Sequence, residues 1–425
     1  MEFGSVLQFL ENKTILVTGV TGFLAKIFVE KILRVQPNVK KLYLLLRAAD
    51  ATSASHRFQN EVIGKDLFRV AKEKWDANLN SIIAKKISIV PGDVRYEDLG
   101  IKDSSLKEEM KIELDIVLNF AATTKFDESS GLIPESPYCL GQTLNGVSKL
   151  DIEEEKKLID EKINELQAEG APETMVKRAM KDMGNKRAKT FGWPNTYVFT
   201  KAMGEMLVGH LKENVPAAII RPTMITATCK EPFPGWIEGA STVDALTLAY
   251  GKGKLSFFAV DSAAIADVIP GDIVVNAIIL AMVAHANQPC NDIIYHVGSP
   301  ARNPIRCSDI EDYRIRYFTN KPWIGKNGKP VKVVSKITIF NSIAKFHRFI
   351  RIRYLPLLKV CHKHFHLIIF KFHYLYSFFF YSKKLRIAAE KNCVETEIFL
   401  VDPKFIHWDD YFLNINFPGV AKYVF

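Results

Sequence analysis

The sequence predicts an α/β fold, a Rossmann-type doubly wound parallel sheet with a helical insertion and a mainly helical C-terminal domain. Three observations lead to this prediction. Short apolar runs alternate with helical stretches, which is typical of a parallel sheet covered on both faces. A glycine-containing turn directly follows the first apolar run. Beyond about residue 325, apolar and basic residues dominate in a mainly helical pattern.

The expected strands are the apolar runs themselves. Four precede the insertion and two follow it, and the second run, KKLYLLLRA, is apolar on both faces. We expect a reductase domain over residues 10–305, a helical insertion within it at about 149–190, and a C-terminal domain over 325–425. The expected strands are 14–18, 40–48, 85–94, 114–122, 217–223 and 293–299.

The insertion is charged and helical. Ile152, Ile159, Ile163 and Leu166 lie roughly on one stripe, and Gly170 is a typical helix stop. A second helical piece runs on to about residue 190. We interpret the insertion as a pair of helices lying over a surface; a binding surface or lid is the alternative.

Composition narrows the class of protein. The 425 residues are enough for two or three domains, and 48% hydrophobic with 24% charged residues is ordinary for a globular chain. The net charge of +10 favours anionic partners, but the basic residues form no long run, so we expect no nucleic-acid partner. Six scattered cysteines without C-x-x-C spacing indicate no metal site and a reduced, intracellular compartment. The N-terminus resembles neither a secretory signal nor a transit peptide.

The strongest motif is VTGVTGFLA at residues 17–25, between the first strand and an amphipathic helix. Gly19 allows the tight turn, Gly22 lets the backbone approach a pyrophosphate, and Ala25 permits close packing of helix on strand. The helix N-terminus then offers N–H donors and a partial positive charge to phosphates. The motif therefore predicts a dinucleotide site.

The ends of the next strands indicate which dinucleotide binds. Arg47 at the end of the second strand suits a ribose 2′-phosphate, so NADPH is the expected cofactor. Nearby Asp50 complicates this reading, and a plain surface arginine is the alternative. Asp93 could accept from the adenine amine, while small Ala121 and Ala122 would let a sugar approach. Further expected cofactor contacts are Thr18, Thr21, Phe23, Leu24, Val94, Lys201 and Pro222.

Tyr197 and Lys201 are four residues apart, in NTYVFTKAMGE, and so share a helix face. When the motif is taken by itself, a packed helix face is the more common explanation, because Tyr-x-x-x-Lys occurs by chance in many helices. Next to a dinucleotide site, the Lys201 ammonium would lower the phenol pKa and hold the nicotinamide ribose. Tyr197 would then protonate a carbonyl oxygen as its carbon receives a hydride.

Several motifs together resemble the plant alcohol-forming fatty acyl-CoA reductases, within the extended short-chain dehydrogenase/reductase superfamily. The resemblance rests on TGVTGFLAK, LYLLLRA, PGDV, AATTKFDE, GWPNTYVFTKAMGEM, IIRPTMI, EPFPGWIEG and the closing VETEIFLVDPKFIHWDDYFLNINFPGVAKYVF, and it covers most of the chain. It implies NADPH-dependent reduction of long-chain acyl-CoA, through an aldehyde, to a primary alcohol. It also implies Tyr197 as the acid, Lys201 as its partner, and cofactor contacts at Gly19, Gly22 and Arg47.

One segment of the family pattern is missing. The family has a helix and a strand after the fourth strand, and that strand ends near a serine that polarises the substrate carbonyl. Here AATTKFDE runs into SSGLIPESPYCLGQTLNG, and we expect no apolar strand between Phe120 and Ala217. Ser129, Ser130 and Ser136 are interpreted as loop residues. The loss after Asp127 leaves two unpaired central edges or makes the next strand slide into the gap.

Two functional interpretations therefore stand side by side. The first is a fatty acyl-CoA reductase that uses NADPH. The second is a catalytically impaired or inactive paralogue that retains at most cofactor or partner binding, because misplacements near 1 Å cost orders of magnitude in rate.

The aromatic stretch FHLIIFKFHYLYSFFFY at 365–381 bears on membranes. It is short and is interrupted by His366, Lys371 and His373, so it does not predict a membrane span. A buried helix is one interpretation, and a membrane-surface anchor aided by Lys383, Lys384 and Arg386 is the other. The expected location is the cytoplasm or the cytosolic face of the endoplasmic reticulum, the latter because of the resemblance.

Overall fold

The structure is a computed structural model that describes residues 5–121, 137–146, 149–240, 242–286, 293–353, 395 and 397–425. Some residues singled out in the sequence lie outside this range. They are Ala122, Ser129, Ser130, Ser136 and the aromatic stretch at 365–381.

The first four predicted strands are confirmed and form one parallel sheet in the order β3-β2-β1-β4. The central strand β1 is buried along its whole length, as its apolar run TILVT requires. Ile15 lies opposite Leu42 of β2 on one side and Ile116 of β4 on the other. The strands are β1 (Thr14–Thr18), β2 (Lys41–Leu46), β3 (Ile87–Pro91) and β4 (Ile116–Asn119).

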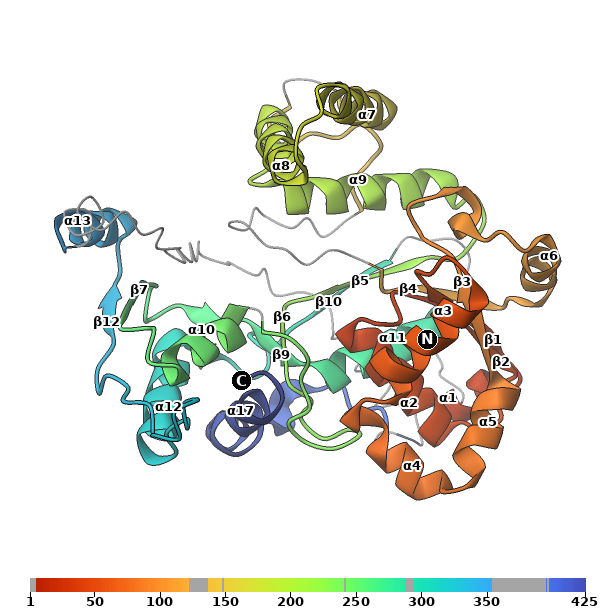
Figure 1. Cartoon of the computed structure of the whole chain (residues 1–425). Coiled ribbons are helices and arrows are strands. Elements are labelled where there is room, and N and C mark those ends of the chain that lie inside the picture. Colours follow the sequence, from red (N-terminus) through yellow and green to blue (C-terminus); the bar gives the residue numbers. More distant parts are fainter. Residues whose placement is uncertain are drawn as a thin grey trace.

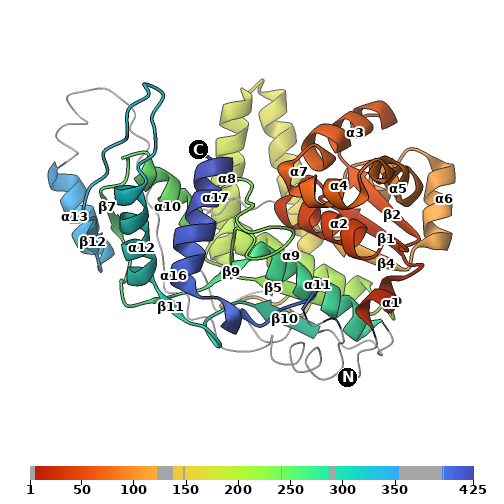
Figure 2. The same cartoon turned by 90° about the horizontal axis from the view of Figure 1, so that it is seen from below.

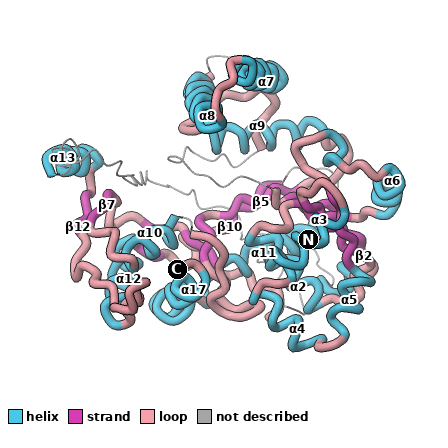
Figure 3. The backbone as a smooth tube through the Cα atoms, in the orientation of Figure 1, coloured by secondary structure: helices cyan, strands magenta, loops and turns pink. Residues whose placement is uncertain are grey.

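The next two predicted strands, β5 (Ala218–Pro222) and β10 (Ile293–Val297), form a separate two-stranded parallel sheet. Among the described residues no strand connects β4 to β5, so the sheet is split where the missing strand was predicted. Figure 3 labels β5 and β10 near the middle of the molecule and β2 of the first sheet toward the right. The first alternative is thus confirmed: β5 does not slide against β4. Val117 of β4 is 61% exposed, which shows how open this part of the sheet is.

Two helices hold the halves of the sheet together on one face (Figures 1 and 2). The helix α2 (Phe23–Val35) follows β1, and α11 (Gly271–His285) packs against both α2 and β5. The two helices lie so close together that a Cβ at Gly271 would be 2.6 Å from the Phe23 ring. The nearly continuous apolar sequence of α11 explains why it is buried on almost all sides.

The other face is covered unevenly. Helix α6 (Ser104–Glu113) packs Met110 against Leu16 and Val90 of the four-stranded sheet. Helices α7 (Ile152–Ala168), α8 (Glu173–Thr190) and α9 (Thr196–Leu211) form a separate lobe, seen at the top of Figure 1.

The helical insertion is confirmed as α7 and α8, but its predicted stripe is partly wrong. Ile152 and Leu166 are buried, whereas Ile159 is 38% exposed. The buried position on that turn is Glu155, whose carboxylate pairs with Arg187 of α8. A charged pair between the two helices therefore takes the place of an apolar contact. Gly170 ends the first helix with a φ of +67°.

The C-terminal residues 397–425 pack against the same core as α2 and α11, through Phe399, Trp408, Tyr411 and Phe417. None of the described helices is both long and apolar enough to cross a membrane. The remaining helices are α1 (Val6–Leu10), α3 (Ala51–Phe58), α4 (Arg69–Trp75), α5 (Asn78–Lys86), α10 (Thr242–Gly251), α12 (Cys307–Asn320), α13 (Ile343–Arg353), α16 (Trp408–Asp410) and α17 (Phe417–Tyr423). The remaining strands are β6 (Met224–Thr226), β7 (Phe257–Ala259), β8 (Ile265–Ala266), β9 (Val268–Pro270), β11 (Ile305–Arg306) and β12 (Thr338–Phe340).

Candidate active site

The predicted glycine turn lies between β1 and α2. Gly19 has a φ of +68°, and a Cβ there would lie 2.6 Å from the backbone nitrogen of Ala121, just beyond β4. Only glycine fits so close an approach in this conformation. Gly22 is the N-cap of α2, so the first N–H groups of that helix face the turn. These features fit a pyrophosphate group at the helix N-terminus.

The turn is joined to the end of β4 by polar contacts. The Thr18 hydroxyl donates to the Asn119 side-chain oxygen at 2.6 Å. The Ala121 N–H donates to that oxygen at 3.1 Å and to the Thr18 hydroxyl at 3.3 Å. Thr18, Gly19 and Ala121 are therefore brought together as predicted. Asn119 was missed by sequence reasoning, although its place at the end of an apolar run was a usable signal.

The loop containing EPFPGWIEG fastens α2 in place. Trp236 stacks on Phe23 with ring centroids 5.0 Å apart. Glu238 forms an ion pair with Lys26, which is almost fully buried in the second turn of α2. Burial lowers the pKa of Lys26, and the Glu238 hydrogen bond opposes that shift. The loop thus positions the helix whose N-terminus would face phosphates.

An open pocket lies at the carboxyl ends of β2 and β3, with a volume of about 410 Å³. Arg47 and Asp93 both line it, as predicted for the adenosine half of a cofactor. Arg95 binds the Asp93 carboxylate at 2.7 Å and, with a smaller contribution from Arg47, holds its pKa below the ordinary value. Val94 is 45% exposed and does not line the pocket. The complete lining is Arg47, Ala48, Ala49, Gly92, Asp93, Tyr96, Gly100 and Lys102.

Two details of this pocket were not evident from sequence. The Asp50 carboxylate caps α3 by accepting from the Ser53 N–H at 2.7 Å, and Asp50 does not line the pocket. Lys102 adds a second exposed cation to the lining. It comes from the loop before α6 and carries no motif, so only the fold shows its position.

Tyr197 and Lys201 share one face of α9, with the ammonium 5.8 Å from the Tyr197 ring centroid. Tyr197 is half-buried, and burial raises its pKa. The expected lowering of the phenol pKa by Lys201 is therefore absent in this structure. Partial desolvation also lowers the pKa of Lys201 itself, which weakens the cation as a partner.

Helix α9 is held by a small second core and not by the main one. Trp193 and Phe199 pack with Tyr138 and Phe191, apart from the core around α2. Asn195 caps the helix by accepting from the Val198 N–H at 3.0 Å. The Tyr-Lys pair therefore has its own support, separate from that of the glycine turn.

One ion pair ties α9 to the sheet. Arg221 of β5 donates to both oxygens of Glu205, at 2.5 and 2.7 Å. Pro222, the next residue, ends β5 opposite Val297 of β10. The predicted site residues thus form two groups, one at the turn and pocket beside β1–β3 and one on α9 and β5.

Strand, glycine turn and helix are arranged as in Rossmann-type domains that bind a nicotinamide dinucleotide, and the first part of this chain belongs to that class. A family model described as male sterility protein, of the NAD-binding type, matches residues 17–132 and 142–278. An alcohol-forming fatty acyl-CoA reductase of Simmondsia chinensis is 46% identical, with 100% of this chain and 99% of the relative covered. The chain belongs to the family of fatty acyl-CoA reductases.

A second plant relative and a solved structure are also similar to this chain. A probable fatty acyl-CoA reductase 4 of Arabidopsis thaliana is 42% identical, covering 98% of each chain. The reductase domain of a nonribosomal peptide synthetase from Mycobacterium tuberculosis aligns with a TM-score of 0.49 at 18% identity, covering 81% of this chain and 76% of that one.

The comparisons also bear on the missing segment. The alignment with the Simmondsia reductase spans 490 residues, whereas this chain has 425, so that relative carries residues that are lacking here. The family match is interrupted between residues 132 and 142, close to the predicted loss after Asp127. The split between β4 and β5 has the same place in the fold.

Proposed function

We propose that this chain reduces long-chain fatty acyl-CoA to a primary fatty alcohol, through an aldehyde, with NADPH as the reductant. The observation that carries the proposal is the likeness to the Simmondsia reductase along the whole chain. The Gly19 turn and the N-terminus of α2 support it, because they fit a pyrophosphate.

The preference for NADPH rests on Arg47. Its guanidinium is exposed at the rim of the pocket beyond β2, and Lys102 adds a second cation there. Two cations favour a 2′-phosphate over a bare 2′-hydroxyl. Arg47→Ala should weaken NADPH binding about ten- to hundredfold and leave NADH binding nearly unchanged. Titration of each dinucleotide tests this, with Arg316→Ala at an exposed position of α12 as the control.

In the proposed chemistry, two successive molecules of NADPH would each supply one hydride: the first reduction would release CoA as its thiol and leave the aldehyde, and the second would give the alcohol. Tyr197 would donate its phenolic proton to the substrate oxygen, and Lys201 would hold the phenol and a ribose hydroxyl in position. A phenol with a raised pKa is a weak acid, so this role requires the Lys201 ammonium to come closer than in the present structure.

The second candidate function is cofactor or partner binding without turnover. The split between β4 and β5 favours it, since α9 lacks the neighbours that would fix it over the turn. Errors of about 1 Å in such positions cost about hundredfold in rate.

One experiment separates the two candidates. Purified protein is incubated with NADPH and palmitoyl- or stearoyl-CoA, and alcohol and aldehyde are measured by gas chromatography. Turnover that Tyr197→Phe abolishes and Tyr313→Phe retains supports the reductase. NADPH binding without either product supports the second candidate and rejects the first.

A membrane surface is the proposed partner of the C-terminal region. The described helix α13 carries Lys345, Arg348, Arg351 and Arg353, all exposed, and no acidic residue. Its Phe346 packs inward against Phe340, so the cations lie on the outer side. Each cation near an anionic membrane contributes about 1 kcal/mol. Arg348→Gln with Arg351→Gln should weaken co-sedimentation with phosphatidylserine vesicles, whereas Arg316→Gln should not. A location at the cytosolic face of the endoplasmic reticulum would follow from such binding.

A further inference from the structure

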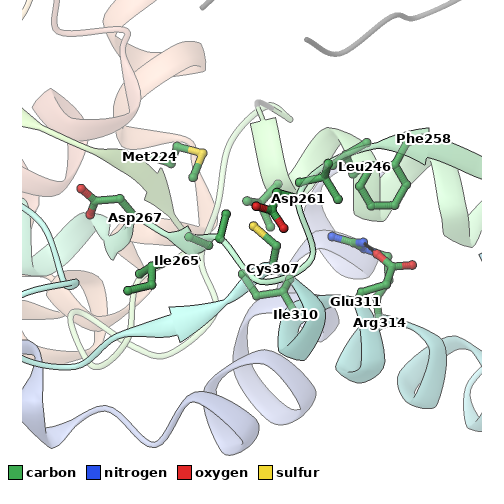
Figure 4. Close-up of a pocket in the computed structure, with 14 residues that line it drawn as sticks. Met224, Leu246, Phe258, Asp261, Ile265, Asp267, Cys307, Ile310, Glu311 and Arg314 are labelled. Carbon is green, nitrogen blue, oxygen red and sulfur yellow. Dashed lines mark hydrogen bonds and ion pairs between the residues drawn. The ribbon is translucent and has the colours of Figure 1, made fainter. Parts of the chain in front are cut away.

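A second, mainly apolar pocket lies between α10, β7, β8 and the first turns of α12 (Figure 4). It is separate from the Arg47 pocket and shares no residue with it. Met224 lines one side, and it starts β6 two residues after the end of β5. In open α/β sheets ligands lie beyond the carboxyl ends of the strands. The pocket therefore adjoins the ligand side of the sheet.

One end of the pocket is closed and the other is open. Leu246, Phe258 and Ile310 form the inner end, and all three are at least nine-tenths buried. Ile265, at the other end, is 43% exposed. Figure 4 shows Met224 and Ile265 on one side and Leu246 and Phe258 on the opposite side. An elongated ligand would enter at Ile265 and stop at Leu246.

The walls carry no unbalanced charge at the inner end. The buried Arg314 guanidinium pairs with Glu311, and its Nε donates to the Thr247 hydroxyl at 3.2 Å. Burial raises the pKa of the Cys307 thiol to about 11, so this group stays neutral. Moving this ion pair to lengthen the pocket would separate buried charges, which costs several kcal/mol. The inner end of the pocket therefore does not extend readily to hold a longer ligand.

The cavity volume is about 80 Å³. An apolar cavity of about 150 Å³ holds a benzene molecule, so this one has room for only the last few carbons of a chain. It is too small for a nucleotide, and its apolar lining offers little to a sugar or phosphate.

We infer that this pocket binds the methyl end of the fatty acyl chain and that Leu246, Phe258 and Ile310 set the longest chain accepted. The inference rests on the acyl-CoA activity proposed above and adds the position of the tail to it. Burying one methylene group is favourable by a factor of about four, so excluding two carbons costs about tenfold in kcat/KM.

The test changes the size of the pocket and leaves the rest of the chain alone. Ala264→Leu narrows the pocket near its mouth, and Leu246→Ala lengthens it. Ala263→Leu is the matched control, because Ala263 is the exposed neighbour that does not line the pocket. The kcat/KM is measured with decanoyl-, myristoyl-, stearoyl- and arachidoyl-CoA.

We expect Ala264→Leu to lower the stearoyl-to-decanoyl ratio of kcat/KM about tenfold or more. Leu246→Ala should raise the arachidoyl-to-stearoyl ratio, and Ala263→Leu should reproduce the wild-type profile. A wild-type profile in both pocket variants overturns the inference, while the activity itself would stand.

A binding measurement keeps the two proposals distinguishable. Fluorescence of parinaric acid reports occupancy of an apolar site without turnover, and stearate competes for it. If the wild type turns over no acyl-CoA, the proposed activity fails, and the binding measurement alone decides the inference. Weaker binding in Ala264→Leu than in Ala263→Leu supports the acyl pocket; equal binding in the wild type and both variants overturns it.

Discussion

The two halves of the split sheet differ in how completely they are built. In the first half, β1 and β2 are paired on both sides. Ion pairs from Glu231 and Glu238 hold α2, and the glycine turn contacts the end of β4. Around β5, a single partner strand remains, and α9 depends on a small aromatic core and the Arg221–Glu205 pair.

The difference teaches that the two groups of predicted site residues have separate supports. Around the glycine turn, β1, α2 and the end of β4 keep close contacts. Around β5, β10 is the one partner strand among the described residues. If Tyr197 is the proton donor, the rate would depend on how firmly α9 holds it relative to the turn.

The largest expected effect comes from restoring the missing strand. A chimera receives, between Asp127 and Pro134, the residues of the Simmondsia reductase that align with this place. If the split limits catalysis, NADPH-dependent alcohol formation should rise about hundredfold or more, because α9 regains its neighbours. Gas chromatography of the products measures the change. A glycine-serine linker of equal length is the control, and an equal rise with the linker would contradict the explanation.

The second effect is expected at the glycine turn. Gly19→Ala places a Cβ 2.6 Å from the Ala121 nitrogen at a φ of +68°, so we expect a loss of about 2–4 kcal/mol in the free energy of unfolding. NADPH affinity should fall more than about tenfold in the same variant. Urea denaturation and cofactor titration measure both.

Gly170→Ala is the matched control for this substitution. Gly170 has nearly the same φ, +67°, with nothing within 4 Å of a built Cβ. Gly170→Ala should lower the free energy of unfolding by about 1–2 kcal/mol, because of its backbone conformation, and should leave the NADPH affinity unchanged. If Gly19→Ala and Gly170→Ala lost equal stability and equal NADPH affinity, the close approach of Gly19 to Ala121 would contribute to neither quantity.

The third effect concerns a buried charge in α2. Burial raises the pKa of Glu30 to about 7, despite its ion pair with Arg34 at 2.9 Å. The folded state therefore keeps a proton that the unfolded state releases near its ordinary pKa. The protonated Glu30 makes its full contribution to the free energy of unfolding below about pH 4.5. As the pH rises to about 7, the free energy of unfolding falls by roughly 3 kcal/mol.

Glu30→Gln tests this pH dependence. The variant should lose less stability than the wild type between pH 4.5 and 7.5, as measured by thermal unfolding across that range. Glu173→Gln, at a fully exposed position on α8, is the control and should follow the wild type. If the stability of Glu30→Gln and wild type changed with pH in the same way, Glu30 would be in contact with solvent and not buried in α2.

The smallest effect tests how open the split is. Val17 of β1 is fully buried, and Val117 of β4 is 61% exposed. Val17→Ser should lower the free energy of unfolding by about 3 kcal/mol, whereas Val117→Ser should change it by no more than about 0.5 kcal/mol. Chemical denaturation measures both. A large loss in Val117→Ser would mean that another segment covers β4 in solution.

Much of the fold was predictable because its signals are local. Six apolar runs gave six strands, and the glycine motif gave a turn with the expected positive φ at Gly19. The missing strand was predictable because an apolar run is absent between Phe120 and Ala217. The short strands β7, β8, β11 and β12 were not predicted, since two or three residues carry no periodicity.

The site was less predictable than the fold. The sequence places Tyr197 and Lys201 on one helix face but not the distance of that helix from the turn. The sequence pattern also predicts that Ile159 lies on a buried stripe, but Ile159 is exposed and Glu155 is buried. Glu155 can be buried because Arg187 of the next helix forms an ion pair with it. Lys102 and the pocket lined by Leu246 and Ile310 depend on elements far apart along the chain.

By itself, the sequence determined the strands, the glycine turn and the gap in the sheet, because hydrophobic periodicity and glycine conformation act over a few neighbouring residues. The tertiary structure decided which edges stay unpaired, how the α2 and α11 helices span the gap, and where Tyr197 lies. Those outcomes depend on packing between segments that are distant in sequence, and a pattern of neighbouring residues does not encode them directly.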